Sequence, residues 1–339
     1  MKVSVSIIVP VYSGKDYLKK LVDSISKVRN EWRLNNYPLE ILELIFVDDD
    51  SKDGSKEVLE KLQGNDWIST ITLSKNYGQH PATVAGISHS SGDWIVTMDE
   101  DLQHNPEEII KMLKKCIEDG SDILYVKSEK AVHQSYFRDL TSKYYKKLVQ
   151  KLTGNKNISN FNSFRLIRGS IGRNAAAVVG HESYLDVVLS WFSDKISIYK
   201  TILEDQRYIE TGESGYNLSR LLSHARRMLM TSDAKLLRGA SYLGFTVFTF
   251  CILLSCYFIL KKMIEPESIL IAGWASQVVI NLTTISIVLI ILGVVAEYLS
   301  ILIQESNGKP AYSTVNRDKD RLIEEFLEGL EFVSVKEKK

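Results

Sequence analysis

The chain has 339 residues, which is enough for one large domain or two smaller ones. Lysine and arginine together number 42, as do aspartate and glutamate, so the balanced charge gives no indication of a nucleic-acid-binding protein. The three cysteines form no CxxC motif and predict no disulfide framework, which fits a reducing compartment. The apolar run at the amino terminus is too short for a signal peptide, so we expect the first part of the chain in the cytoplasm.

Strand-like and helix-like segments alternate through the first 130 or so residues. Five short apolar runs have the composition of strands, and the segments between them carry apolar residues at helical spacing. This alternation predicts an α/β fold with right-handed crossovers and a mainly parallel, doubly wound sheet. No GxGxxG follows the first strand, so the dinucleotide-binding fingerprint is absent. The predicted strands cover residues 5–12, 43–47, 69–73, 94–98 and 122–126, and helices begin near residues 16, 58, 81 and 106.

An acidic cluster follows the fourth predicted strand. Asp99, Glu100 and Asp101 lie at its carboxyl end, where open α/β sheets place their ligands. Asp99 and Asp101 are separated by one residue on a turn, so both carboxylates can bind the same hard cation. Oxygens of a diphosphate and of water would complete its coordination. An isolated Asp-x-Asp is more often a solvated turn. Its position at a strand end favours a divalent-metal site.

A second acidic cluster, Asp48 to Asp50, ends the second predicted strand. Carboxylates repel phosphate, but they accept hydrogen bonds from the imide of a nucleobase or from ribose hydroxyls. The alternative is a turn whose aspartates cap the following helix, and both roles can hold at once.

Two long apolar stretches lie in the last third of the chain. Residues 239–260 contain no acid, and residues 273–296 contain only Gln277 and Asn281 as strongly polar members. About 20 apolar residues suffice to cross a bilayer, so we expect two transmembrane helices rather than a buried hairpin. Basic residues before the first stretch and in the tail predict a multi-pass protein of the inner membrane, with both ends in the cytoplasm.

Two segments are strongly basic. Residues 137–156 carry six basic side chains and one acid, with apolar side chains on one helical face. Such a helix can lie on a membrane surface or form a solvated face of the domain. Residues 217–239 favour the membrane, because each charge contributes about 1 kcal/mol near an anionic leaflet. The basic residues of this second segment are Arg220, Arg226, Arg227, Lys235 and Arg238.

The chain also carries a series of motifs in a fixed order. They are IIVPVY (7–12), VDDDSKDGS (47–55), LSKNYG (73–78), AG (85–86), MDEDLQHNPEE (98–108), SFRLIR (163–168), GESGY (212–216), GWAS (273–276) and VAEYL (295–299). Together they resemble the motifs of family 2 glycosyltransferases of the GT-A fold. Within that family the chain is similar to the polyprenyl-phosphate branch, which includes bacterial undecaprenyl-phosphate sugar transferases and dolichol-phosphate mannose synthases. The resemblance covers nearly the whole chain.

This resemblance implies a Rossmann-like GT-A catalytic domain followed by two transmembrane helices. It also implies which residues bind the nucleotide-sugar donor and its metal ion. Asp99, Asp101 and Gln103 would hold Mg²⁺ or Mn²⁺ against the diphosphate. The chain departs from the family pattern at Ser13 and Gly14, where Asn-Glu is common, and at Asp50, which replaces a usual glycine. The residues expected to bind the nucleotide sugar are Pro10, Tyr12, Asp48, Asp49, Lys75, Asp99 and Glu100.

The expected function is an inverting transfer of one sugar from a UDP-sugar, with glucose or a related hexose favoured, to polyprenyl (undecaprenyl) phosphate at the cytoplasmic membrane face. The acceptor phosphate is largely ionised because its second pKa is about 6, so no strong base is required. Asp101, Arg165 and Arg138 are the expected catalytic residues. For Arg165 the alternative is a structural salt bridge. The residues expected to bind the lipid phosphate are Arg138, Lys143, Arg165, Ser214 and Tyr216.

Two other functions remain open from the residues. A processive polysaccharide synthase would carry a Gln-x-x-Arg-Trp motif, which Gln206-Arg207-Tyr208 does not supply. A membrane-anchored, non-catalytic binder of a nucleotide or lipid carrier would not need Asp99, Asp101 and Gln103. The expected partners are the lipid bilayer, a second copy of the chain and a membrane flippase. The predicted organisation is a catalytic domain (1–216), basic juxtamembrane helices (217–238), a transmembrane hairpin (239–303) and a cytosolic tail (304–339).

Overall fold

The computed structural model describes residues 2–129, 157–201, 227–228, 231, 235–264 and 273–315. Several predictions fall outside these residues. They concern the basic segment 137–156, the domain boundary at residue 216, and the lipid-phosphate candidates Arg138, Lys143, Ser214 and Tyr216.

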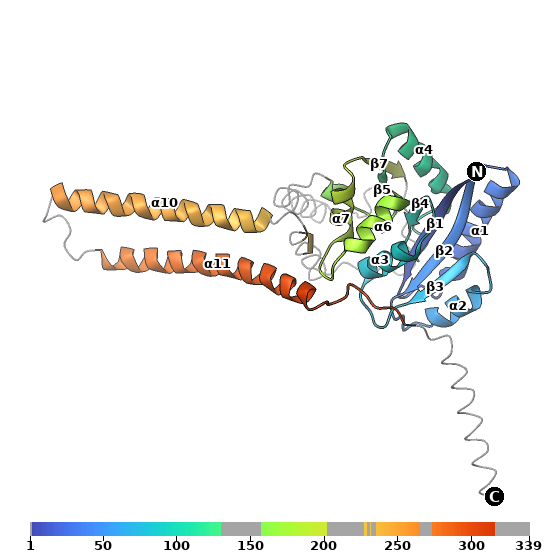
Figure 1. The fold of residues 1–339 in the computed structure, drawn as a ribbon, viewed down its shortest axis with the longest axis horizontal. Coiled ribbons are helices and arrows are strands. Elements are labelled where there is room, and N and C mark those ends of the chain that lie inside the picture. Colours follow the sequence, from blue (N-terminus) through green and yellow to red (C-terminus); the bar gives the residue numbers. More distant parts are fainter. Residues whose placement is uncertain are drawn as a thin grey trace, which may run out of the picture.

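A seven-stranded sheet forms the centre of the amino-terminal part, with the order β3-β2-β1-β4-β6-β5-β7 (Figure 1). Strands β1 to β4 pair in parallel, as do β5 and β7, whereas β6 runs antiparallel to both of its neighbours. The predicted mainly parallel α/β sheet is therefore confirmed. The strands are β1 (Val3–Val11), β2 (Leu39–Asp48), β3 (Ile68–Thr72), β4 (Trp94–Thr97), β5 (Ile123–Ser128), β6 (Arg165–Arg168) and β7 (Ile196–Thr201).

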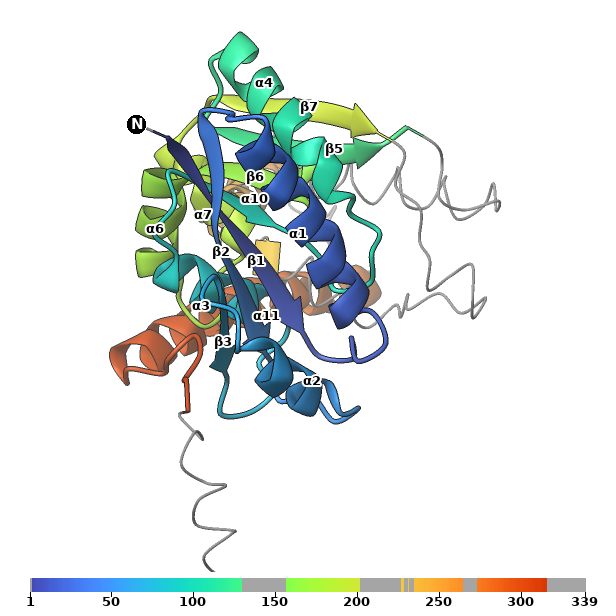
Figure 2. The same ribbon diagram turned by 90° about the vertical axis from the view of Figure 1, so that its right-hand side faces the viewer.

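Helices cover both faces of this sheet because its central strands are apolar on both sides. In β1, Val5, Ile7 and Val9 join the core under α1, α2 and α4, whereas Ile8 joins the core under α3, α6 and α7. Figure 2 shows α1 and α4 on one side of the sheet and α3 and α6 on the other. The helices are α1 (Leu18–Leu34), α2 (Ser55–Leu62), α3 (Gln79–His89), α4 (Ile109–Asp119), α6 (Gly169–Val178) and α7 (Leu185–Phe192), with short 3-10 turns η1 (Pro106–Glu108) and η2 (Ile158–Asn160).

The turn after β4 begins the next helix as the sequence predicts. Pro106 is the first residue of η1, where a proline loses no hydrogen bond. Asn105 caps this turn, since its side-chain oxygen accepts the N–H of Glu107 at 3.0 Å. Gly120 ends α4 with φ of 61°, a left-handed conformation that glycine adopts without steric cost. These local signals fix where the chain leaves the acidic turn.

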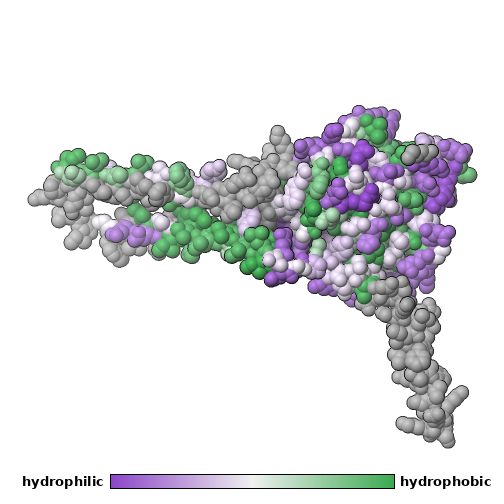
Figure 3. All heavy atoms as spheres, in the orientation of Figure 1, coloured by the Kyte–Doolittle hydropathy of each residue, from purple (hydrophilic) through white to green (hydrophobic). Residues whose placement is uncertain are grey.

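Two long helices, α10 (Lys235–Ile264) and α11 (Trp274–Ser306), extend side by side away from the sheet (Figure 1). Among the described residues one stretch, Thr283–Ser306, is long and apolar enough to cross a bilayer, and its most apolar part is not buried at all. Green apolar side chains gather along this part of the molecule in Figure 3. The first predicted span falls in α10, whose side chains are described only in part, so the membrane hairpin stays a prediction.

The chain returns to the sheet after α11. Ser74 donates its N–H to the carbonyl of Ser313 (2.9 Å), and Val315 donates to the carbonyl of Thr72 (2.9 Å). These bonds form an antiparallel bridge between Leu73 and Thr314 beside the edge strand β3. We call residues 312–315 the strap. The strap connects the end of the apolar helix to the loop that follows β3.

Candidate active site

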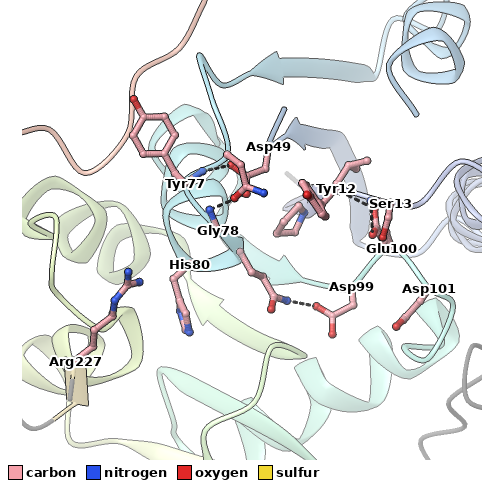
Figure 4. A pocket seen from close by; sticks show the side chains of 14 residues that line it. Tyr12, Ser13, Asp49, Tyr77, Gly78, His80, Asp99, Glu100, Asp101 and Arg227 are labelled. Carbon is pink, nitrogen blue, oxygen red and sulfur yellow. Dashed lines mark hydrogen bonds between the residues drawn. The ribbon is translucent and has the colours of Figure 1, made fainter. Parts of the chain in front are cut away.

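A cavity of about 540 Å³ lies at the carboxyl ends of β1, β2 and β4. Because these strands are parallel, their ends meet at one edge of the sheet, and the amino terminus of α3 faces the same space. Figure 4 shows the acidic side chains Asp49, Asp99, Glu100 and Asp101 around it. The lining residues are Pro10, Val11, Tyr12, Ser13, Asp49, Asn76, Tyr77, Gly78, Gln79, His80, Asp99, Glu100, Asp101 and Arg227.

Asp49 follows β2 and is almost fully buried. Its carboxylate accepts the N–H groups of Tyr77 and Gly78, both at 2.7 Å, and so holds the loop that leads into α3. Burial raises the pKa of Asp49 to about 6, and the two amide hydrogen bonds only partly offset this effect. Asp48 does not line the cavity and accepts the N–H of Ser51 (3.0 Å). The two roles predicted for this acidic cluster thus fall to different residues. Asp48 stabilises a turn, and Asp49 forms part of the cavity wall.

Glu100 connects the acidic turn to the end of β1. Its two carboxylate oxygens accept the N–H groups of Tyr12 and Ser13, each at 3.0 Å. A side chain at position 14 would collide with this carboxylate, so Gly14 leaves the space that Glu100 needs. The departure from the family pattern at position 14 therefore has a physical reason that the sequence did not reveal.

Asp99 is held from three sides. Gln79 donates its amide to one carboxylate oxygen (2.5 Å) and Ser163 donates its hydroxyl to the other (2.7 Å). The N–H of Asp99 is donated to Nδ1 of His104 (2.9 Å), whose ring is buried and stacked on Phe164 with centroids 4.5 Å apart. Burial lowers the pKa of His104, in agreement with a neutral ring that accepts at Nδ1. This network fixes the direction of the Asp99 carboxylate.

Asp101 shares the cavity with Asp99. Gln103 donates its side-chain amide to one oxygen of Asp101 (2.9 Å) and its N–H to the other (3.3 Å). Between them, Leu102 adopts φ of 64°, a left-handed conformation that costs a residue with a side chain about 1–2 kcal/mol. Local strain of this kind is typical of functional turns. Gln103 orients Asp101 here, and its role as a direct metal ligand stays a prediction.

The oxygen ligands in this cavity fit a divalent cation whose remaining coordination positions are filled by a substrate. Among the described residues, no group of three His, Cys, Asp or Glu side chains is placed to hold a metal ion. Magnesium sites of nucleotide enzymes, however, use only one or two carboxylates plus phosphate oxygens and water. Asp99 and Asp101 supply two hard oxygen ligands in one cavity, and they are the residues that would hold Mg²⁺ or Mn²⁺.

Arg165, a predicted phosphate ligand, lies in the interior and away from the cavity lining. It is 2 % exposed and forms an ion pair with buried Asp186, while its Nε donates to the hydroxyl of Thr97 (3.0 Å). This geometry favours the structural salt bridge. Lys75 also lies outside the lining, with its ammonium 5.1 Å from the ring centroid of Tyr77. Contacts of Arg165 or Lys75 with a substrate stay predictions.

Eight lining residues were not predicted to bind a substrate, namely Val11, Ser13, Asn76, Tyr77, Gly78, Gln79, His80 and Arg227. Asn76 belongs to the LSKNYG motif that the sequence singled out, and Gln79 and His80 follow that motif at the start of α3. Arg227 comes from the second basic segment, far along the chain. The only sequence signal for it was the local excess of positive charge.

The model of the family described as glycosyl transferase family 2 matches residues 6–175. The chain belongs to glycosyl transferase family 2. The matched part spans the strands and turns that carry Asp49, Asp99, Glu100 and Asp101. Family 2 membership thus confirms the resemblance, and it makes this protein a glycosyltransferase.

Several named glycosyltransferases are similar to this chain along most of their own length. An uncharacterized glycosyltransferase of Bacillus subtilis, YkcC, is 29% identical over 91% of this chain and 92% of its own. A bactoprenol glucosyl transferase of Shigella phage SfV is 25% identical over 92% and 98%. An undecaprenyl-phosphate 4-deoxy-4-formamido-L-arabinose transferase of Edwardsiella ictaluri is 26% identical over 92% and 93%. A solved glucosyl-3-phosphoglycerate synthase of Mycobacterium tuberculosis, with Mn²⁺ and UDP-glucose, is 14% identical with a TM-score of 0.47 over 68% of this chain and 79% of its own.

Proposed function

We propose that this family 2 enzyme transfers a single sugar from a UDP-sugar, with glucose or a related hexose favoured, to a polyprenyl phosphate such as undecaprenyl phosphate. The observation that carries the proposal is the shared cavity of Asp49, Asp99 and Asp101 in a chain that also contains a long, exposed apolar helix. Such a chain brings a site for a nucleotide diphosphate to a membrane, where a lipid acceptor is found. Two relatives that match nearly end to end are named for bactoprenol or undecaprenyl phosphate.

The donor would lie along the acidic wall of the cavity. The Asp49 carboxylate accepts hydrogen bonds and lies where β2 ends, so it suits the imide of the base. Pro10 and Tyr12 line the same end of β1 and suit the base and ribose. The diphosphate carries negative charge and would be repelled by Asp99 and Asp101 alone. A divalent cation held by these two carboxylates would neutralise the charge that develops on the departing diphosphate.

The chain's own residues would act by position and charge. The network of Gln79, Ser163 and His104 holds Asp99, and Gln103 holds Asp101, so little reorganisation is needed when the donor binds. The acceptor is a phosphate monoester that is largely ionised at neutral pH, so no side chain has to remove a proton. Attack from the face opposite to the diphosphate would invert the configuration at the sugar carbon.

The membrane arrangement belongs to the same proposal. The helices α10 and α11 would form a hairpin in the inner membrane, with the sheet on the cytoplasmic side. The span Thr283–Ser306 would be about 36 Å long as a helix, enough for the hydrocarbon core of about 30 Å. A second copy of the chain and a flippase for the lipid-linked sugar are the partners that such an enzyme would use.

A panel of substrates tests this function directly. Purified full-length protein in detergent or vesicles is incubated with Mg²⁺, UDP- or GDP-sugars and undecaprenyl phosphate, and both UDP release and the lipid product are followed by mass spectrometry. The proposal expects one sugar per lipid and equal amounts of UDP and product. A growing polymer would instead show a processive synthase. Nucleotide binding without release or product for any donor would show a non-catalytic binder.

A further inference from the structure

A positive end of the cavity lies apart from its acidic wall. In Figure 4, Arg227 is at one end, Asp99 and Asp101 are at the other, and His80 lies between them. Arg227 is the cationic side chain among the lining residues given above, and 27% of its side chain is exposed. Its Nε lies 3.8 Å from Glu182 and has no hydrogen-bond partner among the described residues. Nε is itself buried, so an anionic ligand in the cavity would meet the other N–H donors of this lining guanidinium.

Local contacts hold Arg227 in this place. Thr231, four positions further on, donates its hydroxyl to the carbonyl of Arg227 (2.7 Å) and accepts the N–H of Tyr184 (2.9 Å) just before α7. The adjacent residue, Met228, packs on Ile158 in a small apolar cluster. The position of Arg227 is thus set by the catalytic domain rather than by chance placement of a long side chain.

Further positive charges come from distant parts of the chain. Burial and then the positive charge of Lys309 lower the pKa of His181, Glu182 raises it, and Arg227 and Lys75 lower it by smaller amounts than these. Each of the three cations therefore lies near the ring of His181. Lys75 follows β3, His181 precedes α7, and Lys309 follows α11. The fold therefore brings Lys75, Arg227 and Lys309 to the neighbourhood of His181, where the carboxylate of Glu182 offsets part of their charge.

This positive end adjoins the place where the apolar helix reaches the catalytic domain. A Cβ on Gly180 would lie 2.7 Å from the carboxylate of Glu305, so the end of α11 packs against the loop that carries His181 and Glu182. Lys309, three residues beyond α11, donates to Gln304 on its last turn (2.7 Å). A headgroup at the surface of a bilayer crossed by α11 would therefore be close to Arg227.

We infer that Arg227, with the ammonium groups of Lys75 and Lys309 nearby, binds the phosphate of the lipid acceptor. The inference rests on the proposed transfer to a polyprenyl phosphate. A donor diphosphate is the other phosphate in the reaction, but its charge would be met by a cation at Asp99 and Asp101. A guanidinium also binds phosphate through two parallel hydrogen bonds, which would fix the acceptor oxygen toward the sugar.

Steady-state kinetics of Arg227→Gln separates the two phosphates. Undecaprenyl phosphate in detergent micelles is varied at saturating UDP-glucose or whichever donor supports turnover, and the donor is then varied at saturating acceptor. We expect the KM for undecaprenyl phosphate to rise about tenfold or more, as is usual for a lost charge-assisted hydrogen bond, while the KM for the donor changes less than about twofold. Arg227→Lys should recover part of the lost acceptor affinity, because lysine keeps the positive charge but cannot form the two parallel hydrogen bonds of a guanidinium.

Two further variants keep the inference testable if Arg227→Gln folds poorly. Lys309→Gln removes a more distant charge and should raise the acceptor KM a few-fold, with a weaker dependence of that KM on salt than in the wild type. Arg33→Gln is the matched control, since Arg33 pairs with Glu40 at the far end of α1 and should leave both KM values unchanged. A rise in donor KM alone, or unchanged acceptor KM in folded Arg227→Gln and Lys309→Gln, would overturn the inference. A wild type without any transfer would instead overturn the proposed function.

Discussion

The carboxylate of Glu100 occupies the space that a side chain at position 14 would need, because Gly14 has no Cβ. From this position Glu100 accepts the N–H groups of Tyr12 and Ser13. The acidic turn after β4 is thereby connected to the end of β1, 88 residues earlier in the chain for the bond to Tyr12. Two sides of the cavity consequently depend on one carboxylate and on the absence of one methyl group.

Gly14→Ala should therefore damage both stability and donor binding. The new methyl group would displace Glu100 and leave two amides without their acceptor, which we expect to lower the free energy of unfolding by about 1–3 kcal/mol. Urea denaturation measures the loss, and titration with UDP-glucose should show weaker binding. Gly64→Ala is the control, because nothing lies within 4 Å of a Cβ at Gly64. Unchanged stability and affinity in Gly14→Ala would refute this role of Glu100.

Donor affinity should fall as the pH drops through about 6. The pKa of Asp49 is raised to about 6, and only its ionised form offers both oxygens as acceptors to the base and to the amides of Tyr77 and Gly78. Affinity should be constant above pH 7 and decrease by up to about tenfold per pH unit below 6, as the ionised fraction falls. The stability of the fold has the opposite pH dependence. Between the ordinary pKa of 3.8 and about 6 the folded state keeps the proton on Asp49, so the free energy of unfolding falls as the pH rises.

Calorimetric titration with UDP-glucose from pH 5 to 8 measures this dependence. UDP-glucose is preferable to UDP because its diphosphate has no terminal phosphate that ionises near pH 6. Asp49→Asn should remove the inflection, while Asp93→Asn, an exposed carboxylate bonded to Ser4, should retain it. An inflection that survives in Asp49→Asn would assign it to another group.

The buried pair of Arg165 and Asp186 should act on stability rather than on the lipid acceptor. Asp186→Asn leaves the Arg165 charge buried without its partner, which typically costs about 3–5 kcal/mol. Replacing both residues by apolar ones, Arg165→Met with Asp186→Leu, should restore much of this loss. Chemical denaturation gives the stabilities. If Arg165→Met raised the acceptor KM while the free energy of unfolding stayed the same, Arg165 would be a phosphate ligand after all.

The strap should hold the loop that lines the cavity. Val315→Pro removes the N–H that Val315 donates to Thr72, a loss worth about 1 kcal/mol, whereas Thr314→Ala keeps both backbone bonds. We expect faster hydrogen exchange over residues 72–78 and weaker UDP-glucose binding in Val315→Pro only. Equal exchange in the two variants would show that the strap does not support the site.

The strands and the acidic turns could be predicted because their signals are local. Residues 94–98 were predicted as a strand from one apolar run, and the structure has Trp94–Thr97 as β4. Pro106, followed by Glu107 and Glu108, likewise marked the start of the next helix, where the structure has η1. Position at the carboxyl end of parallel strands then sufficed to bring Asp49, Asp99 and Asp101 to one edge of the sheet.

Features that depend on distant pairing could not be predicted. The bond between Ser74 and Ser313 joins residues more than 200 positions apart, and neither sequence segment has a pattern that selects the other. The burial of Arg165 depends on Asp186 from α7, so the choice between an ion pair and a phosphate ligand was open until the fold was known. The fit between Gly14 and Glu100 is a steric relationship, which spacing along the chain does not express.

The most direct test measures lipid-linked sugar formation from UDP-glucose and undecaprenyl phosphate as a function of Mn²⁺ or Mg²⁺, for the wild type and for Asp101→Asn. We expect no product in the presence of a chelator, recovery when the metal is added back, and a rate at least about 100-fold lower in Asp101→Asn at every metal concentration. Full product formation with the chelator present, or a wild-type rate in Asp101→Asn, would contradict a metal-assisted transfer at Asp99 and Asp101.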